Sequence, residues 1–102
     1  MHRLVAEKQD QIAALCRRFH VRRLDLFGSA ATGTFDPALS DVDFLVEFED
    51  LQPGEYADAY FGLLAALEAL VERPVDLVMS GAVRNPYLLR SIAATRAQLY
   101  AA

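Results

Sequence analysis

The sequence predicts an α+β fold, with a small mixed β-sheet and helices packed mainly on one face of that sheet. Two observations predict this class. Segments whose apolar residues recur every three or four positions, as in amphipathic helices, interleave with short apolar segments typical of strands. Their order along the chain is helix, strand, strand, helix, strand, helix and a final strand, which is typical of an α+β domain.

The composition sets the size and broad class of the protein. The chain has 102 residues, of which 54% are hydrophobic and 24% charged, so we expect residues 1–102 to form a single domain with an apolar core. No apolar run approaches the roughly 20 residues of a membrane span, and the first residues lack the apolar stretch of a signal peptide. A cytoplasmic protein without membrane association is therefore expected.

The first helix is predicted over residues 3–19. Its stripe of three- and four-residue steps is apolar except for one lysine. The stripe consists of Leu4, Lys8, Ile12, Leu15 and Phe19. Cys16 is the only cysteine and falls where the apolar stripe would place it, so we expect a buried structural thiol. Arg17 and Arg18 stand near the helix C-terminus, where the macrodipole favours cations.

Two strands and a turn follow. Residues 24–27 predict a strand that stops at Gly28, and the small and polar residues as far as Gly33 predict a tight turn into a short helix or loop. Pro37 and Ser40 mark the approach to the second strand. That strand, residues 42–48, is predicted from apolar residues at alternate positions.

The second half of the chain predicts two helices and two strands. A long helix ends before Pro74, and residues 75–78 form a short strand. Asn85 and Pro86 suit the start of the last helix, as its N-cap and first-turn residue. Residues 97–100 are expected to close the sheet as an edge strand. The long helix has a continuous apolar stripe of Tyr60, Leu63, Leu64, Leu67, Leu70 and Val71.

Charge is segregated along the chain. Residues 1–35 carry six basic and three acidic side chains, residues 36–80 one basic and eleven acidic, and residues 81–102 three basic and none acidic. An acidic centre without a basic stripe argues against autonomous binding of nucleic acid, and it suits a cation or a basic partner surface. The oligomeric state stays open, a homo-oligomer included. Seven acidic residues are expected only to be solvated: Glu47, Glu49, Asp50, Glu55, Asp58, Glu68 and Glu72.

Two carboxylates at the head of the second strand are the main candidates for a functional site. Asp41 and Asp43 alternate with apolar residues, so they share one strand face with Cα atoms roughly 6.5–7 Å apart. Side chains placed in this way can lean toward one small cation or a close pair, and Mg²⁺ prefers such oxygen ligands. Asp76 is the candidate third ligand, because a charge inside an apolar strand needs a partner.

The turn before these carboxylates suits phosphate. Gly28 permits a close approach of the backbone, and the Ser29 hydroxyl can donate a hydrogen bond to a terminal phosphate oxygen. Gly33 lets the turn fold over without obstruction by a side chain. A Gly-Ser pair alone recurs by chance in many loops. Its weight here comes from the Ser-Asp-Val-Asp segment that begins at Ser40, eleven residues after the serine.

Together these residues predict phosphoryl chemistry assisted by two metal ions. One ion would ease the deprotonation of an attacking hydroxyl, and the other would hold a triphosphate and offset the charge on the departing pyrophosphate. Asp41 and Asp43 would bridge both ions. Asp76 would hold the ion that serves the nucleophile and could accept its proton. No motif assigns a role to His2 or His20.

With these residues the chain resembles the nucleotidyltransferase superfamily of DNA polymerase beta, and within it the minimal nucleotidyltransferase branch. The resemblance spans nearly the whole chain and implies the polymerase beta-like palm fold. It rests on the joint occurrence of Gly28-Ser29, Gly33, Ser40-Asp41-Val42-Asp43 with the following strand to Phe48, Arg73-Pro74-Val75-Asp76-Leu77-Val78, and Arg84-Asn85-Pro86-Tyr87.

The resemblance implies a function. Family members transfer a nucleoside monophosphate, usually AMP from ATP, onto a hydroxyl with the help of Mg²⁺, and the family roles match those given above to Asp41, Asp43, Asp76 and Ser29. Minimal members are often encoded beside a helical HEPN-domain protein, as a toxin–antitoxin pair in which the transferase is the antitoxin and adenylylates a tyrosine of the HEPN ribonuclease. A HEPN-domain toxin is thus the implied partner and a protein hydroxyl the implied acceptor.

Two positions depart from the family pattern. Thr32 stands where arginine is common in the turn, so one cationic contact to the triphosphate is missing. The spacing from Ser29 to Asp41 is one residue longer than usual, with residues 36–39 filling the loop. Both departures predict weaker or slower use of the nucleotide and leave the metal ligands intact. Arg84 or an arginine of the partner could supply the missing charge.

Two other functions compete with a working protein adenylyltransferase. One is a catalytically weak or inactive module that neutralises its toxin by binding alone. The other places the acceptor on a small molecule or an RNA end, which the short chain disfavours because no further domain is present to form a deep pocket or a basic channel.

Overall fold

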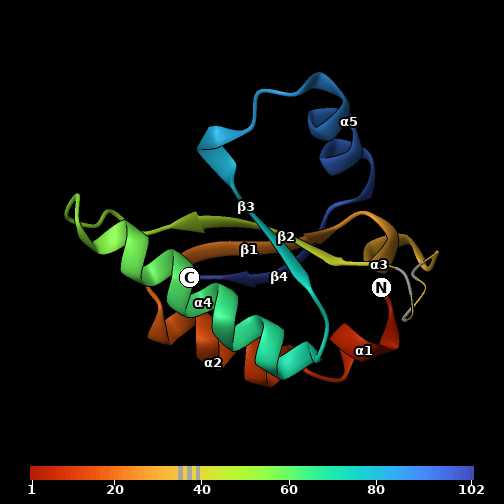
Figure 1. Cartoon of the computed structure of the whole chain (residues 1–102), viewed down its shortest axis with the longest axis horizontal. Coiled ribbons are helices and arrows are strands. Elements are labelled where there is room, and N and C mark those ends of the chain that lie inside the picture. The colour runs from red at the N-terminus through yellow and green to blue at the C-terminus, as the bar shows by residue number, and fades with distance from the viewer. Residues whose placement is uncertain (35, 37, 39) are drawn as a thin grey trace.

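A four-stranded mixed sheet, in the order β3-β2-β1-β4, lies at the centre of the computed structural model, which describes residues 1–34, 36, 38 and 40–102 (Figure 1). β1 (Val21–Phe27) pairs antiparallel with both β2 (Val42–Phe48) and β4 (Ala97–Ala101). β2 pairs in parallel with β3 (Val75–Met79). The α+β class and the mixed sheet are thus confirmed, and the first three strands of the chain are neighbours in the sheet.

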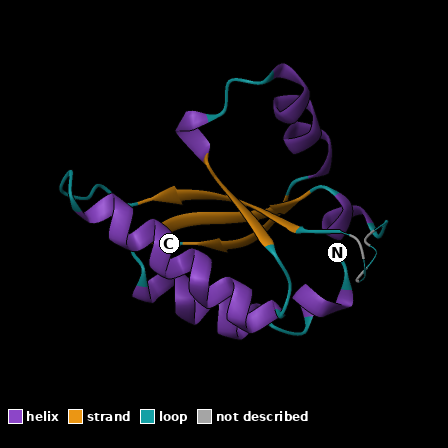
Figure 2. Cartoon of the chain, in the orientation of Figure 1, coloured by secondary structure: helices purple, strands orange, loops and turns teal. Residues whose placement is uncertain are grey.

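Most of the helical mass covers one face of this sheet. α2 (Gln9–Arg18) and α4 (Glu55–Val71) lie side by side along that face, which Figure 2 shows as two adjacent helices beneath the strands. Between the helices and the strands lies the main core. Its fully buried members include Ile12, Cys16, Leu24, Leu26, Phe44, Val46, Leu63 and Leu67. Cys16 is therefore the buried thiol that the sequence predicted, and burial raises its pKa to about 12.

Fewer helical residues cover the opposite face of the sheet. The single-turn helix η1 (Ser80–Ala82) and α5 (Pro86–Thr95) lie on that side (Figure 1). Because successive strand residues point to opposite faces, Phe44 of β2 faces the main core, whereas Leu45 faces α5. A small apolar cluster fills this second interface: Phe27, Leu45, Val83 and Ile92. The prediction that helices pack mainly on one face is confirmed.

Local signals explain where the later helices begin and end. The Asn85 side chain caps α5 by accepting hydrogen bonds from the amides of Tyr87, at 2.8 Å, and Leu88, at 3.3 Å, and Pro86 opens the first turn. α4 ends where Glu72 adopts a left-handed backbone with φ of 54°, two residues before Pro74.

The predicted helix over residues 3–19 is wrong in its continuity. The structure has a short α1 (Arg3–Ala6) before α2, and Lys8 lies between them with a non-helical backbone at φ −110° and ψ 14°. Lys8 was the one charged member of the predicted stripe. The helix is interrupted at the residue whose side chain is costly to bury.

The first strand is longer than predicted. β1 starts at Val21 rather than at residue 24, because His20 takes a left-handed φ of 60° directly after α2 and turns the chain into the sheet. The arginines at this position kept the start of β1 from being predicted from the sequence. Arg22 extends from the strand to Glu47 of β2, with Nη1 donating to Oε1 at 3.3 Å.

Other sequence predictions concern the loops and the surface. The turn after Gly28 does lead into a short helix, α3 (Ser29–Thr32). The seven acidic residues expected to be solvated are all exposed. Pro37 and Leu39 of the longer loop lie outside the described residues. In the part of the chain that the structure describes, no helix is both long and apolar enough to cross a membrane.

Candidate active site

Two of the three carboxylates predicted from the sequence are brought side by side by the register of β2 and β3. Asp43 of β2 stands beside Asp76 of parallel β3, and on its other side it stands opposite Phe27, the last residue of β1. Neighbouring strands lie about 4.8 Å apart, and residues paired in register share a face. Asp43 and Asp76 therefore project from the same side of the sheet, the side that faces α5, at the end where β1 leads into Gly28.

The surroundings of the three aspartates differ. Asp41 precedes β2 and is exposed, and Asp76 is exposed on the edge strand, whereas Asp43 is half-buried. The sequence argument that Asp76 sits buried in an apolar strand is thus wrong. Register, rather than burial, brings Asp76 to Asp43.

Negative charge is concentrated at Asp43. Burial, and after it the neighbouring carboxylates of Asp76 and Asp41, together raise the pKa of the Asp43 carboxyl to about 6. The side chains do not form a closed cage: within residues 1–34, 36, 38 and 40–102, no three acidic, histidine or cysteine groups are drawn together closely enough to hold a metal ion. The site is an open group of like charges around a half-buried carboxylate.

Gly28 brings the turn against this carboxylate. Its backbone, at φ 71° and ψ −150°, lies in a region that essentially only glycine adopts. A methyl group built on its Cα would overlap Oδ2 of Asp43. Gly28 is therefore required twice, by its conformation and by the closeness of Asp43, which explains the glycine of the Gly-Ser pair.

Gly33 has a different role from the one predicted. It ends α3 with a left-handed φ of 86°, and its amide donates to the Ser29 carbonyl at 3.1 Å. A Cβ atom at this position would meet no atom of the described residues within 4 Å. The glycine is thus explained by backbone conformation and not by space for a neighbouring group.

The backbone amides of the turn are not all free. The Gly28 amide donates to Oγ1 of Thr95 in α5 at 2.8 Å. Among the described residues, nothing accepts a hydrogen bond from the amides of Ser29 and Ala30. Thr32, at the position of the missing arginine, turns its hydroxyl back toward the Gly28 and Ser29 carbonyls, at 3.4 Å each.

One charged cluster on the same face was missed by the sequence analysis. Asp25 of β1 is completely buried and accepts hydrogen bonds from Arg23 Nε at 3.0 Å, Arg96 Nε at 2.8 Å and, more closely, Arg96 Nη2. An acidic residue within an apolar strand was the signal used for Asp76. The same signal applied to Asp25 would have found a truly buried charge with its partners.

Arg84 does not extend freely toward the aspartates. Its Nη1 donates to the carbonyls of Gly81, at 2.9 Å, and Val83, at 3.1 Å, so the guanidinium is bound to its own loop.

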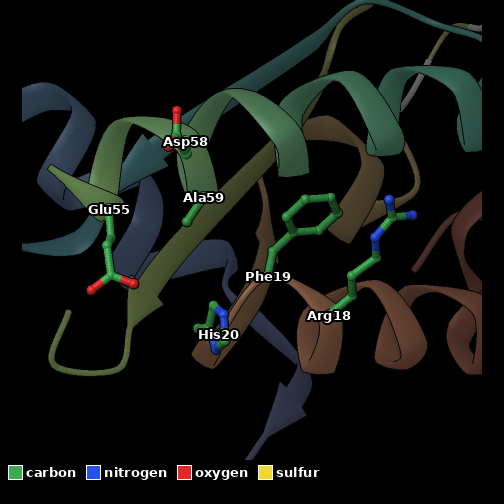
Figure 3. Close-up of a pocket in the computed structure, with 6 residues that line it drawn as sticks. All are labelled: Arg18, Phe19, His20, Glu55, Asp58 and Ala59. Atoms are coloured by element: carbon green, nitrogen blue, oxygen red, sulfur yellow. The ribbon is translucent and has the colours of Figure 1, made fainter. Parts of the chain in front are cut away.

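A cavity of about 220 Å³ lies at the other end of the β1–β2 pair. Figure 3 shows it at the junction of α2 and α4, with the Phe19 ring beside the Arg18 side chain. His20, one of the lining residues, directly precedes Val21, which pairs with Phe48, whereas the site lies where Phe27 pairs with Asp43. The cavity therefore has no part in the aspartate site. It is lined by Arg18, Phe19, His20, Glu55, Asp58 and Ala59.

Comparison with known proteins agrees with this geometry. The profile of the family described as "Nucleotidyltransferase domain" matches residues 9–98. A curated relative, the "Putative protein adenylyltransferase MJ1379" of Methanocaldococcus jannaschii, is 33% identical over 75 residues, which are 74% of this chain and 73% of the relative.

Two solved structures have the same fold. One, described as a "putative minimal nucleotidyltransferase", gives a TM-score of 0.73 at 28% identity and covers 91% of this chain and 90% of its own. The other, a "toxin-antitoxin with AMP-PNP", gives a TM-score of 0.70 at 26% identity and covers 92% of this chain and 73% of its own.

The matched profile, the relative and the sheet with its aspartates define a nucleotidyltransferase. The chain belongs to the nucleotidyltransferase domain family. Within that family, the predicted resemblance to the minimal nucleotidyltransferases and to the MntA component of toxin–antitoxin pairs is confirmed by the structural matches.

Proposed function

We propose that this chain transfers AMP from ATP to a tyrosine hydroxyl of a HEPN-domain toxin, in a Mg²⁺-dependent reaction that makes it the antitoxin of the pair. The register of Asp43 beside Asp76, with Gly28 packed against Asp43, carries the proposal. It supports the proposal because the two carboxylates and the glycine turn lie at one end of one sheet face, where a cation and a nucleotide could bind together. The relative described as a protein adenylyltransferase supports the acceptor class.

The donor chemistry of the three aspartates suits a divalent cation. Asp41, Asp43 and Asp76 offer only carboxylate oxygens, the donors that Mg²⁺ prefers. The raised pKa of Asp43 reports burial and repulsion that a bound cation would relieve. Bound there, Mg²⁺ would supply Lewis-acid activation of the hydroxyl and neutralisation of the triphosphate. Asp41 and Asp43 are the proposed shared ligands, and Asp76 is the proposed ligand on the side of the nucleophile.

The chain's own groups have distinct tasks in the transfer. The tyrosine oxygen attacks the α-phosphorus, the bond from that phosphorus to the bridging oxygen breaks, and pyrophosphate leaves with the electron pair. The proton of the hydroxyl passes to a carboxylate oxygen of Asp76. Asp76 suits this task because it is exposed at the edge strand and accessible to a bulky protein acceptor.

The turn is proposed to bind the phosphates. The amides of Ser29 and Ala30 are the donors left without an acceptor among the described residues, and the Ser29 hydroxyl can add a third hydrogen bond. Gly28 permits a close approach of the backbone. Its own amide already donates a hydrogen bond to Thr95. Gly33 is proposed to act indirectly, by ending α3 so that the loop can close the turn.

The proposal extends to the whole chain and its complex. Residues 1–102 would act as one unit, with the partner's tyrosine entering between the edge strand β3 and the turn. The chain spans 73% of the matched toxin–antitoxin component that was solved with AMP-PNP, a non-hydrolysable ATP analogue. That structure supports ATP as the nucleotide.

The test is transfer to the partner, measured by mass. The purified chain is incubated with ATP, Mg²⁺ and the HEPN-domain protein encoded beside it, and the intact mass of that protein is recorded. We expect an adenylyl adduct on a tyrosine. We expect Asp43→Asn to lower the rate by more than about a hundredfold, beyond the cost of losing an outer-shell metal partner.

The matched control lies on the same strand. Glu47→Gln also removes one carboxylate from the α5-facing side of β2, but its partner is Arg22 at the surface, so the rate is expected to stay within about twofold of wild type. A partner that binds but gains no adduct would refute the proposal. If Asp43→Asn still neutralised the toxin fully, the binding-only antitoxin would be the correct function.

A further inference from the structure

The end of α5 is bonded to the nucleotide-binding turn through one hydroxyl. Oγ1 of Thr95 accepts the Gly28 amide at 2.8 Å and donates its own proton to the Ser91 carbonyl, one helical turn earlier, at 2.6 Å. A hydroxyl has a single proton to donate. Because that proton is used within α5, the oxygen presents a lone pair to Gly28 in a fixed direction.

Gly28 lies between the proposed metal ligand Asp43 and the proposed phosphate-binding amides. Its Cα packs so closely on Asp43 Oδ2 that no side chain fits between them. The next two residues, Ser29 and Ala30, carry the amides without acceptors among the described residues. A shift of Gly28 would therefore move the proposed phosphate donors and the proposed metal ligand relative to each other.

The residue after Thr95 joins the end of α5 to β1 a second time. Two nitrogens of Arg96 donate hydrogen bonds to the buried carboxylate of Asp25. Asp25 lies two residues before Phe27 on β1. The last residue of α5 and the C-cap residue that follows it are thus bonded to Gly28, directly after β1, and to Asp25 within β1. The contacts join segments 67 and 71 residues apart in the sequence.

We propose that Thr95 is a positioning residue for nucleotide transfer: its hydroxyl holds the Gly28 amide and thereby sets the Ser29 and Ala30 amides at the distance from Asp43 that a metal-bound triphosphate requires. This inference rests on the proposed function and adds to it a residue on a distant element that touches neither metal nor nucleotide.

The experiment compares three variants by ATP affinity in the presence of Mg²⁺ and by hydrogen exchange of the Gly28 amide. Thr95→Val keeps the shape and removes the acceptor, Thr95→Ser keeps the hydroxyl, and Tyr56→Phe is the matched control. The Tyr56 hydroxyl also accepts a backbone amide, that of Leu51 at 3.0 Å, but at the far end of the sheet.

We expect Thr95→Val to weaken ATP binding about tenfold, the worth of one hydrogen bond, and to speed exchange at Gly28 by at least about tenfold. Thr95→Ser should restore both values to within about twofold of wild type. Tyr56→Phe should lose similar thermal stability and leave ATP affinity unchanged, which separates positioning from general destabilisation.

Two results overturn the inference in distinguishable ways. If wild type binds ATP and Thr95→Val binds it equally well at matched stability, Thr95 has no positioning role and the proposed function stands. If wild type binds no ATP with Mg²⁺, the proposed function fails and the inference fails with it, while exchange at Gly28 still reports whether the Thr95 bond exists.

Discussion

The two faces of the sheet differ in what they bury. The face toward α2 and α4 is apolar, with Leu26 and Phe44 completely buried in the main core. Among the described residues, the face toward α5 has a cluster of four buried apolar residues, and it also carries Asp25, Asp43 and Asp76. Since strand side chains alternate, the same strands serve both faces. Neighbouring positions of one strand thereby serve the main core on one face and the proposed site on the other.

The largest expected effect is a loss of unfolding free energy. One substitution on each face of the sheet compares how much the two faces contribute. Leu26→Ala opens a cavity in the main core and should cost about 4 kcal/mol of unfolding free energy. Leu45→Ala, on the α5 side at 6% exposure, should cost about 2 kcal/mol because the thinner cluster can collapse around it. Urea unfolding of both variants measures the difference. Equal losses would mean that α5 contributes as much core as α2 and α4 together.

The second prediction concerns the charged part of the α5 face. Asp25→Asn should cost about 3 kcal/mol, since it leaves Arg23 and Arg96 without a carboxylate, and their side chains are 42% and 40% exposed, which keeps the loss at the low end for a buried pair. Glu47→Gln, which breaks a surface pair with Arg22, should cost less than about 1 kcal/mol.

Thermal and urea unfolding of these two variants provide the measurement. A loss below about 1 kcal/mol for Asp25→Asn would contradict the role of Asp25 as the anchor of α5. Exchange at the Gly28 amide should also increase in this variant, because the end of α5 that holds Thr95 is released from β1.

Local patterns of the sequence predicted the parts of this protein that depend on nearby residues. The alternation over residues 42–48 gave β2 and the placement of Asp43, and Asn85 with Pro86 gave the start of α5. The Gly-Ser turn was placed correctly for the same reason, since a glycine with a positive φ is a local requirement.

Contacts between distant segments could not be predicted in this way. The bonds from Thr95 to Gly28 and from Arg96 to Asp25 join α5 to β1 only after the sheet has formed. The start of β1 was hidden because arginines in a strand look the same as arginines at a helix end. Asp76 was proposed for the site because it lies in an apolar strand, yet it is exposed on the edge strand, and its position beside Asp43 comes from the register of β2 and β3.

The most direct test of the account is to locate a divalent cation on the two faces. Mn²⁺ is titrated with ATP into the isotopically labelled chain, and paramagnetic broadening of the backbone amides is recorded by NMR. The account predicts the strongest broadening at Asp43, Asp76 and Gly28, and its loss in Asp43→Asn. Strongest broadening at the acidic surface near Glu49 and Asp50, unchanged in Asp43→Asn, would contradict it.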